Sequence, residues 1–107
     1  MSWEPLTREE LQQELERAVC ALHPSHRDKF EKISVVPWQV EVTERPGTFL
    51  WVVAEHEGQL LFYEEIEEGW EVEQRNATGG IDGRWANQFE LKHVMYRLFG
   101  RASEDSA

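Results

Sequence analysis

The feature that most constrains the fold is a series of four predicted strands joined by short turns. From Val35 onward, apolar residues alternate with polar ones, which is the two-residue period of a half-buried strand. The three further strands are expected at 48–55, 59–65 and 70–75. Pro-Gly or Glu-Gly pairs, typical of tight turns, separate the strands at 46–47, 57–58 and 68–69. Because such short turns join antiparallel neighbours, the pattern predicts a four-stranded antiparallel meander.

A helix is predicted before the strands. Thr7 and Glu10 have the spacing of a capping box, and apolar residues follow at intervals of three and four. This apolar stripe consists of Leu11, Leu15, Ala18, Val19 and Leu22. We expect Pro24 to end the helix, because the residue before a proline avoids the helical conformation. Residues 25–32 have the pattern of a short second helix.

A last helix is predicted after a glycine-rich loop, residues 76–83, which contains one strand-like position at Ile81. Asn87 is the expected N-cap, with Glu90 at the third helical position, and Gly100 follows the helix. The fold class is therefore α+β, a two-layer sandwich with the N-terminal and C-terminal helices on one face of the meander. Residues 1–100 are expected to form one domain and 101–107 a disordered tail.

Charge and cysteine content narrow the function. The 107 residues include 11 Lys and Arg against 21 Asp and Glu, a formal net charge of −10. Nucleic acids and anionic membranes attract cationic proteins, so neither is an expected partner. Cys20 is the one cysteine, which excludes an internal disulfide and a cysteine-rich zinc site and favours the cytoplasm. No signal peptide or membrane-spanning run is predicted.

The strongest functional feature is the stretch 46–74, which contains no Lys or Arg. Its eight glutamates are Glu55, Glu57, Glu64, Glu65, Glu67, Glu68, Glu71 and Glu73. One interpretation is a negative surface at one end of the sheet that steers a basic protein partner, with Trp51, Tyr63 and Trp70 as anchors. The other is a solvated rim that keeps the sheet edge from pairing. Both interpretations remain open at this point.

The middle strands carry more apolar residues than one covered face requires. Alternation places Trp51 and Val53 on one face of the second strand, and Val52 and Ala54 on the other. Helices on one side cover only one of these sets. The other face is either covered by the sheet's own loops or exposed, and an exposed face would support a homodimer.

An alternative site is the glycine-rich segment Gly79 to Gly83. With Arg84, Trp85 and His93 it would form a small-molecule site or the site of a minor enzyme, although it lacks a phosphate-binding glycine motif. The paired glutamates and the four histidines have no catalytic or metal-ligand spacing. We therefore expect no catalytic residues, no metal and no cofactor.

The size, the acidity and the order of helix, meander and helix resemble small bacterial immunity or inhibitor proteins, and more loosely acidic secretion chaperones. This is a resemblance of type, carried by element order and charge and not by a shared motif. It implies a non-catalytic domain that masks a basic partner through an acidic end of the sheet. A small-molecule-binding domain and a structural homodimer are the alternatives.

Overall fold

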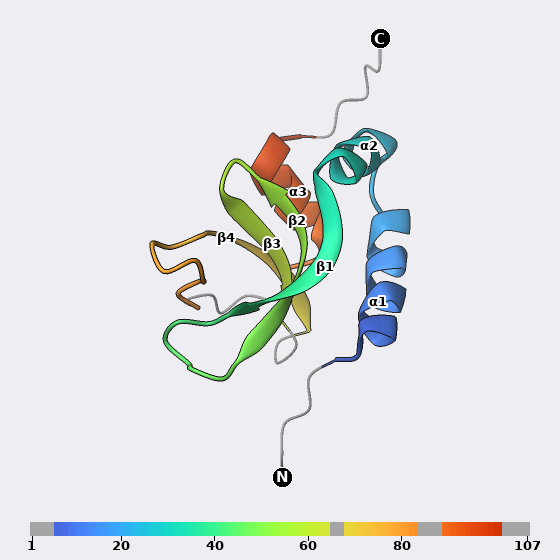
Figure 1. Ribbon diagram of the computed structural model, residues 1–107. Helices are drawn as coiled ribbons and strands as arrows, with labels where there is room; N and C mark the ends of the chain where they lie inside the picture. Colours follow the sequence, from blue (N-terminus) through green and yellow to red (C-terminus); the bar gives the residue numbers. More distant parts are fainter. Residues whose placement is uncertain (1–5, 65–67, 84–88, 102–107) are drawn as a thin grey trace.

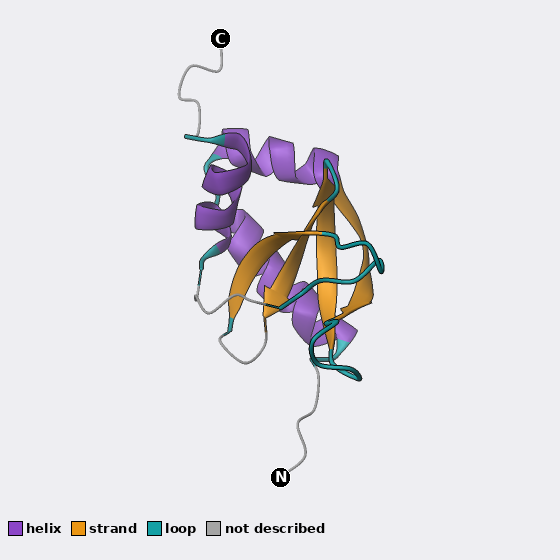
Figure 2. Ribbon diagram, turned by 90° about the vertical axis from the view of Figure 1, so that its left-hand side faces the viewer, coloured by secondary structure: helices purple, strands orange, loops and turns teal. Residues whose placement is uncertain are grey.

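The computed structural model describes residues 6–64, 68–83 and 89–101. The elements are α1 (Arg8–Cys20), α2 (Pro24–Ile33), β1 (Ser34–Glu41), β2 (Phe49–His56), β3 (Gln59–Glu64), β4 (Gly69–Gln74) and α3 (Leu91–Phe99). The strands form one antiparallel sheet in the order β1-β2-β3-β4, with the helices on one side of it (Figures 1 and 2). The predicted α+β fold is confirmed, with N-terminal helices, the meander and a C-terminal helix packed against the sheet.

The helix boundaries follow local signals with two differences from prediction. The capping box is formed: the Glu10 N–H donates to Thr7 Oγ1 at 3.1 Å and the Thr7 N–H to Glu10 Oε1 at 3.0 Å. Pro24 begins α2 instead of ending α1, because a proline in the first turn loses no helical hydrogen bond. Glu90 is the N-cap of α3 and not its third residue. The predicted cap Asn87 lies outside the described residues.

The first two predicted turns are confirmed. The Thr48 N–H donates to the Arg45 carbonyl at 3.0 Å, and Gly47 takes the positive φ of 88° that a type II turn requires. Glu57 and Gly58 both have positive φ, at 49° and 80°, as in the type I′ turn that suits the twist of a hairpin. These turns fix the register of β1 to β2 and of β2 to β3.

The alternation predicted for β2 is broken by a β-bulge. Val52 pairs with Phe62 and Ala54 with Leu61, so Val53 is an extra residue on β2. Val53 and Ala54 therefore both contact the helix-side core, and the expectation that Ala54 would share a face with Val52 is wrong. A bulge of this kind bends the strand locally and increases its twist.

Each face of the sheet has its own core. The helix-side core consists of Leu11, Leu22, Phe30, Val53, Ala54, Leu61, Tyr63, Trp70, Val72, Leu91, Val94 and Met95. The second-face core consists of Val40, Val42, Leu50, Val52, Leu60, Phe62 and Ile81, each at most 2% exposed. The apolar residues of the two faces are thus buried separately.

The second face is covered by the closing segment, residues 76–83. Its Ile81 N–H donates to the Glu41 carbonyl at 3.2 Å, and the Thr43 N–H donates to the Ile81 carbonyl at 2.8 Å. These bonds make a parallel bridge between Ile81 and Val42 and confirm the strand-like position predicted at Ile81. Within the described ranges, no helix has both the length and the apolar character needed to cross a bilayer.

Candidate functional site

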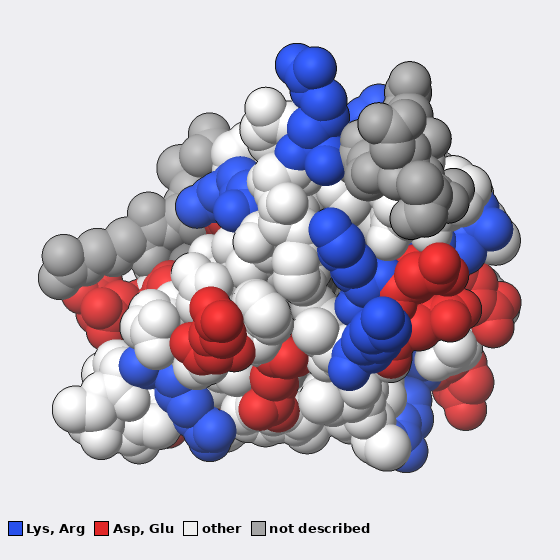
Figure 3. Space-filling model, turned by 90° about the horizontal axis from the view of Figure 1, so that it is seen from above, with Lys and Arg blue, Asp and Glu red and all other residues white. Residues whose placement is uncertain are grey.

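The described glutamates of the predicted run do not gather at one end of the sheet. Successive turns of a meander lie at opposite ends, so Glu57, in the β2–β3 turn, and Glu68, just before β4, are separated by the length of β3, about 20 Å. Glu65 and Glu67 lie outside the described residues. On the face seen in Figure 3, carboxylates also gather in separate groups between basic side chains. The single acidic surface expected at one end of the sheet is therefore not formed by the described residues.

Three of the predicted glutamates are buried or half-buried, and two of them, Glu71 and Glu73, accept hydrogen bonds from other segments. Glu64 is buried, and so is Glu71, which receives a 2.6 Å hydrogen bond from Arg97 Nη1 and a 3.0 Å bond from the Val72 N–H. Glu73 is half-buried and accepts the backbone N–H groups of Asp82 and Gly83, which holds the closing segment on β4. These side chains hold elements together and present little surface to a partner.

The other described members of the run are exposed. Glu55 Oε2 accepts the Trp38 Nε1–H at 2.9 Å. The Glu57 carboxylate lies 3.8 Å from His56 Nε2. The Glu68 side chain is exposed, one residue before the start of β4. These three glutamates are the part of the predicted run that solvent or a partner can reach.

The predicted aromatic anchors belong to the interior. The Trp51 Nε1–H donates to the Leu6 carbonyl at 3.0 Å, which ties β2 to the start of α1. Tyr63 and Trp70 are buried and meet edge to face, with ring centroids 4.9 Å apart. Tyr63 and Trp51 therefore stabilise packing and do not project as surface anchors. Trp70 differs, because one part of its ring borders a groove.

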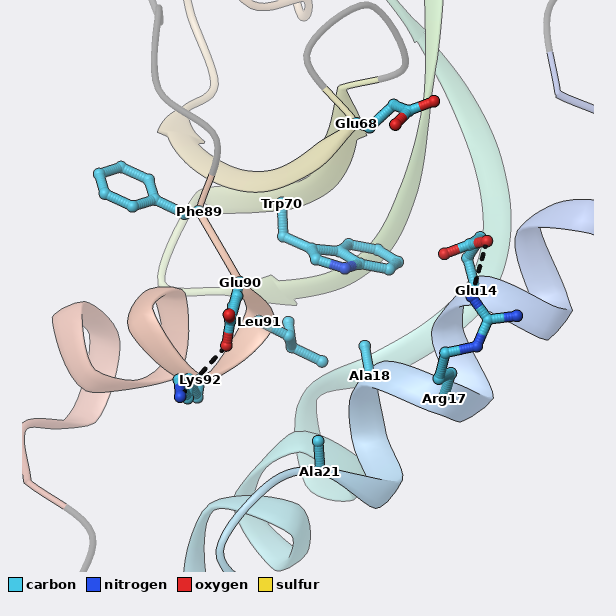
Figure 4. A pocket seen from close by; sticks show the side chains of 10 residues that line it. All are labelled: Glu14, Arg17, Ala18, Ala21, Glu68, Trp70, Phe89, Glu90, Leu91 and Lys92. Atoms are coloured by element: carbon cyan, nitrogen blue, oxygen red, sulfur yellow. Dashed lines mark hydrogen bonds and ion pairs between the residues drawn. The ribbon is translucent and has the colours of Figure 1, made fainter.

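Two grooves flank α1. The α1–α3 groove has a volume of about 420 Å³ and lies between the two helices and the start of β4 (Figure 4). It is lined by Glu14, Arg17, Ala18, Ala21, Glu68, Trp70, Phe89, Glu90, Leu91 and Lys92. Arg17 pairs with Glu14 at 3.1 Å and Lys92 with Glu90 at 3.2 Å, so each cation has a carboxylate on its own helix.

The α1–β1 groove, on the other side of α1, has a volume of about 360 Å³. Its lining residues are Gln12, Leu15, Glu16, Val19, Cys20, Phe30, Glu31, Ser34, Val35, Pro37 and Val53. Most of its surface is apolar, and Glu16 and Glu31 are the only charged residues in this lining. Leu15 and Val19 belong to the predicted apolar stripe of α1, and both are only half-buried, which the periodicity alone does not indicate.

The alternative ligand site is not assembled by the described residues. Arg84 and Trp85 lie outside them. His93 is exposed on α3, where its Nδ1 accepts the Glu90 N–H at 3.3 Å. A groove of about 420 Å³ beside Gly79 and Gly80 opens toward β1 and is not lined by His93. Because Arg84 and Trp85 lie outside the described residues, the small-molecule site expected at the closing segment stays a prediction.

The closing segment has a structural role instead. Asn76 Oδ1 accepts the N–H groups of Thr78 and Gly80 at 3.0 and 3.1 Å. A Cβ on Gly80 would lie 2.6 Å from the Glu41 carbonyl oxygen, so only glycine fits this approach to β1. The homodimer hypothesis relied on an open apolar second face, and in the described residues that face is closed.

Chemical groups for catalysis or metal binding are not gathered in the described ranges, where no three His, Cys, Asp or Glu side chains are placed to hold a metal ion. Cys20 is exposed at the rim of the α1–β1 groove. Comparison with known proteins adds no assignment: no family model matches the chain, and no curated protein or solved structure matches it significantly. Any functional conclusion therefore depends on the two grooves and on charge.

Proposed function

We propose that the protein is a non-catalytic domain that binds a basic protein, and that the α1–β1 groove holds an apolar side chain of this partner. The observation that carries the proposal is the combination of an apolar lining with Glu16 and Glu31 as its charged residues. Phe30 and Val53 are buried and form a fixed floor. Leu15 and Val19 are half-buried and leave apolar surface for a partner.

The energetics favour a partner with apolar and basic residues side by side. Burial of one aliphatic side chain contributes about 1.5–3 kcal/mol, and neighbouring Lys or Arg side chains would pair with the two carboxylates. The net charge of −10 favours approach of a cationic protein. At physiological ionic strength the Debye length is about 8 Å, so the carboxylates that decide the docking position are those at the groove.

The edge of β1 indicates how the partner docks. Pro37 has no N–H to offer a new strand, and its carbonyl accepts Arg8 Nη2 at 3.3 Å. Addition of a strand along β1 is therefore blocked at its middle, and docking proceeds through side chains in the groove. Masking of a basic protein by an immunity or inhibitor type of domain is the concrete form of this proposal. The single cysteine supports a cytoplasmic location.

The test is affinity capture from the native host, followed by titration of the purified partner. The groove variant carries Glu16→Lys and Glu31→Lys. The control carries Asp28→Lys and Glu57→Lys, two exposed positions outside the groove lining with the same change in net charge. Circular dichroism checks that both variants fold.

The proposal predicts a basic partner whose dissociation constant rises at least about tenfold for the groove variant and less than about threefold for the control at 0.15 M salt. If both variants weaken binding equally, the partner responds to the overall charge of the protein, and the proposal that it docks in the α1–β1 groove is wrong. A captured partner that is acidic, or bound equally by all variants, would overturn the proposed function.

A further inference from the structure

The outer edge of β1 is irregular and exposes Val36. Ser34 at the start of β1 pairs with Ala54 on β2. Four residues later, Trp38 pairs with Val52, which is only two positions away from Ala54. The extra residues on β1 form a bulge that contains Val36, whose side chain is 75% exposed. β1 therefore presents apolar surface at its edge, outside both cores.

Two grooves border β1, one along each half of the strand. The first half borders the α1–β1 groove. Residues 38–41, in the second half, border the closing groove, which is the groove of about 420 Å³ beside Gly79 and Gly80. In Figure 1, β1 runs between α1 and the closing segment, which form the other walls. The two grooves are therefore separated along β1 by about four residues of extended strand, roughly 13 Å.

Both grooves offer apolar side chains to a partner. Trp38, Pro46 and Phe49 line the closing groove, and the Phe49 ring is 40% exposed. In the α1–β1 groove, Leu15 and Val19 are half-buried. The two volumes, about 420 and 360 Å³, lie within the usual range of binding pockets. Each groove can therefore accept one apolar side chain.

The charged residues in both linings are acidic. Glu16 and Glu31 line the α1–β1 groove, and Glu41 lines the closing groove. All three residues are exposed, and no ion pair within 4.0 Å joins their carboxylates to a described Lys or Arg. A segment that enters both grooves would therefore meet three carboxylates. Charge complementarity makes the matching partner basic.

Two arginines lie beside the grooves and are bound within the protein. Arg8 Nη2 donates to the Pro37 carbonyl at 3.3 Å. The Arg75 guanidinium lies 5.2 Å from the centre of the Trp38 ring, and Arg75 Nε donates to the Gly79 carbonyl at 2.8 Å. These contacts hold the two cations against β1 and the closing segment. The carboxylates in the linings therefore remain for the cations of a partner.

We propose that an extended basic segment of the partner crosses the edge of β1 and places one apolar side chain in each groove. In an extended chain, side chains four residues apart point the same way and span the roughly 13 Å between the grooves. The same spacing in a helix spans only about 6 Å. Lys or Arg residues beside the two anchors pair with Glu16, Glu31 and Glu41. The segment belongs to the basic partner of the proposed function, on which this proposal rests.

The test uses two synthetic peptides of the same composition and charge, in which only the spacing of two leucines differs. The probe is acetyl-Lys-Leu-Lys-Ser-Lys-Leu-Lys-amide, with the leucines four positions apart. The spacing control, acetyl-Lys-Leu-Lys-Leu-Lys-Ser-Lys-amide, has them two positions apart. Binding is followed by two-dimensional ¹H–¹⁵N NMR at about 50 mM salt, where charge attraction is less screened. We expect the probe to shift amide signals of both grooves with one dissociation constant, at least about fivefold lower than that of the control.

Matched variants test the closing groove, which the proposed function does not include. Phe49→Ser removes part of its apolar wall, and Tyr96→Ser is the control because Tyr96 is 55% exposed on α3 and lines neither groove. Phe49→Ser should raise the dissociation constant of the probe at least about threefold, whereas Tyr96→Ser should leave it unchanged. Dispersion of the amide signals shows whether Phe49→Ser folds. If it does not, Glu41→Gln tests the same groove against Glu57→Gln, with an expected rise of about twofold.

The outcomes distinguish this proposal from the proposed function. Equal binding of the two peptides, or equal effects of Phe49→Ser and Tyr96→Ser, would overturn the two-groove site. Absence of shifts at the closing groove at about 5 mM probe would also overturn it. The captured partner separates the two ideas. If Glu16→Lys with Glu31→Lys weakens its binding and Phe49→Ser does not, the second groove is wrong and the proposed function stands. A partner unaffected by either change overturns both.

Discussion

The two faces of the sheet are closed in different ways. On the second face, the closing segment crosses the core and bonds to β1 through the backbone of Ile81, and the seven core residues are at most 2% exposed. On the helix side, Leu15, Ala18 and Val19 of α1 remain half-buried, with a groove on each side of the helix. We therefore expect the second-face core to contribute more to stability, whereas the helix side offers the apolar surface that a partner can reach.

The reason lies in how α1 is attached. Its main neighbours among the elements are α2 and α3. Leu11 near its start and Leu22 just beyond its end are buried, and the Trp51 N–H holds Leu6 in front of it. The two ends of α1 are thus anchored by buried residues, while the residues in its middle are only half-buried. A backbone-paired segment follows the sheet closely, whereas a helix of 10–12 Å diameter held at its ends leaves grooves beside it.

The largest expected effect comes from the second-face core. Phe62→Ala removes a fully buried ring and should lower the free energy of unfolding by about 3–5 kcal/mol. Leu15→Ala, in the α1–β1 groove, should cost less than about 1.5 kcal/mol because its side chain is only half-buried. Urea unfolding measures both. Equal losses would contradict the contrast between the faces.

The next effect concerns the closing segment. Gly80→Ala places a methyl group against the Glu41 carbonyl, and the required shift should cost about 1–3 kcal/mol. Ala77→Ser, at an exposed position of the same segment, is the control and should cost less than about 0.5 kcal/mol. Hydrogen exchange at the Ile81 and Thr43 amides should accelerate for Gly80→Ala. Unchanged exchange would show that the segment does not seal this face.

Features set by neighbouring residues were predictable. The capping box of Thr7 and Glu10 and the turns at Gly47 and Gly58 depend on side chains within a few positions, and all of them are formed. The meander and the helices around it follow from periodicity for the same reason. The overall fold could therefore be read from local patterns.

Features set by distant contacts were not predictable in the same way. The bulge at Val53 has no turn residue to mark it, and burial of Glu71 depends on Arg97, 26 residues away. The charge run also misled because a run in sequence is not a patch in space: Glu57 and Glu68 belong to successive turns, which a meander places at opposite ends. The grooves beside α1 depend on how three helices pack.

A smaller effect is expected where α3 is tied to the sheet. Arg97→Gln removes the 2.6 Å bond to Glu71 and leaves that buried carboxylate with the 3.0 Å bond from the Val72 N–H. We expect a loss of about 1–2 kcal/mol, limited because half of the arginine side chain is exposed. Lys92→Gln, which breaks an exposed pair with Glu90, should cost less than about 1 kcal/mol. Thermal unfolding measures the melting temperature of both variants. Equal decreases would contradict a stabilising role for the bond between Arg97 and Glu71.

The smallest effect concerns the capping box at the start of α1, the helix that borders both grooves. Hydrogen bonds from the Thr7 backbone and side chain hold the pKa of Glu10 below its ordinary value. A group with a lowered folded pKa stabilises the fold above its unfolded pKa, and this contribution disappears as the pH falls through the folded pKa. Glu10→Gln should therefore be slightly less stable than wild type at pH 7 and equally stable in acid, as followed by urea unfolding across pH. Glu9→Gln is the control, and a difference that persists in acid would show that the Glu10 charge is not the cause.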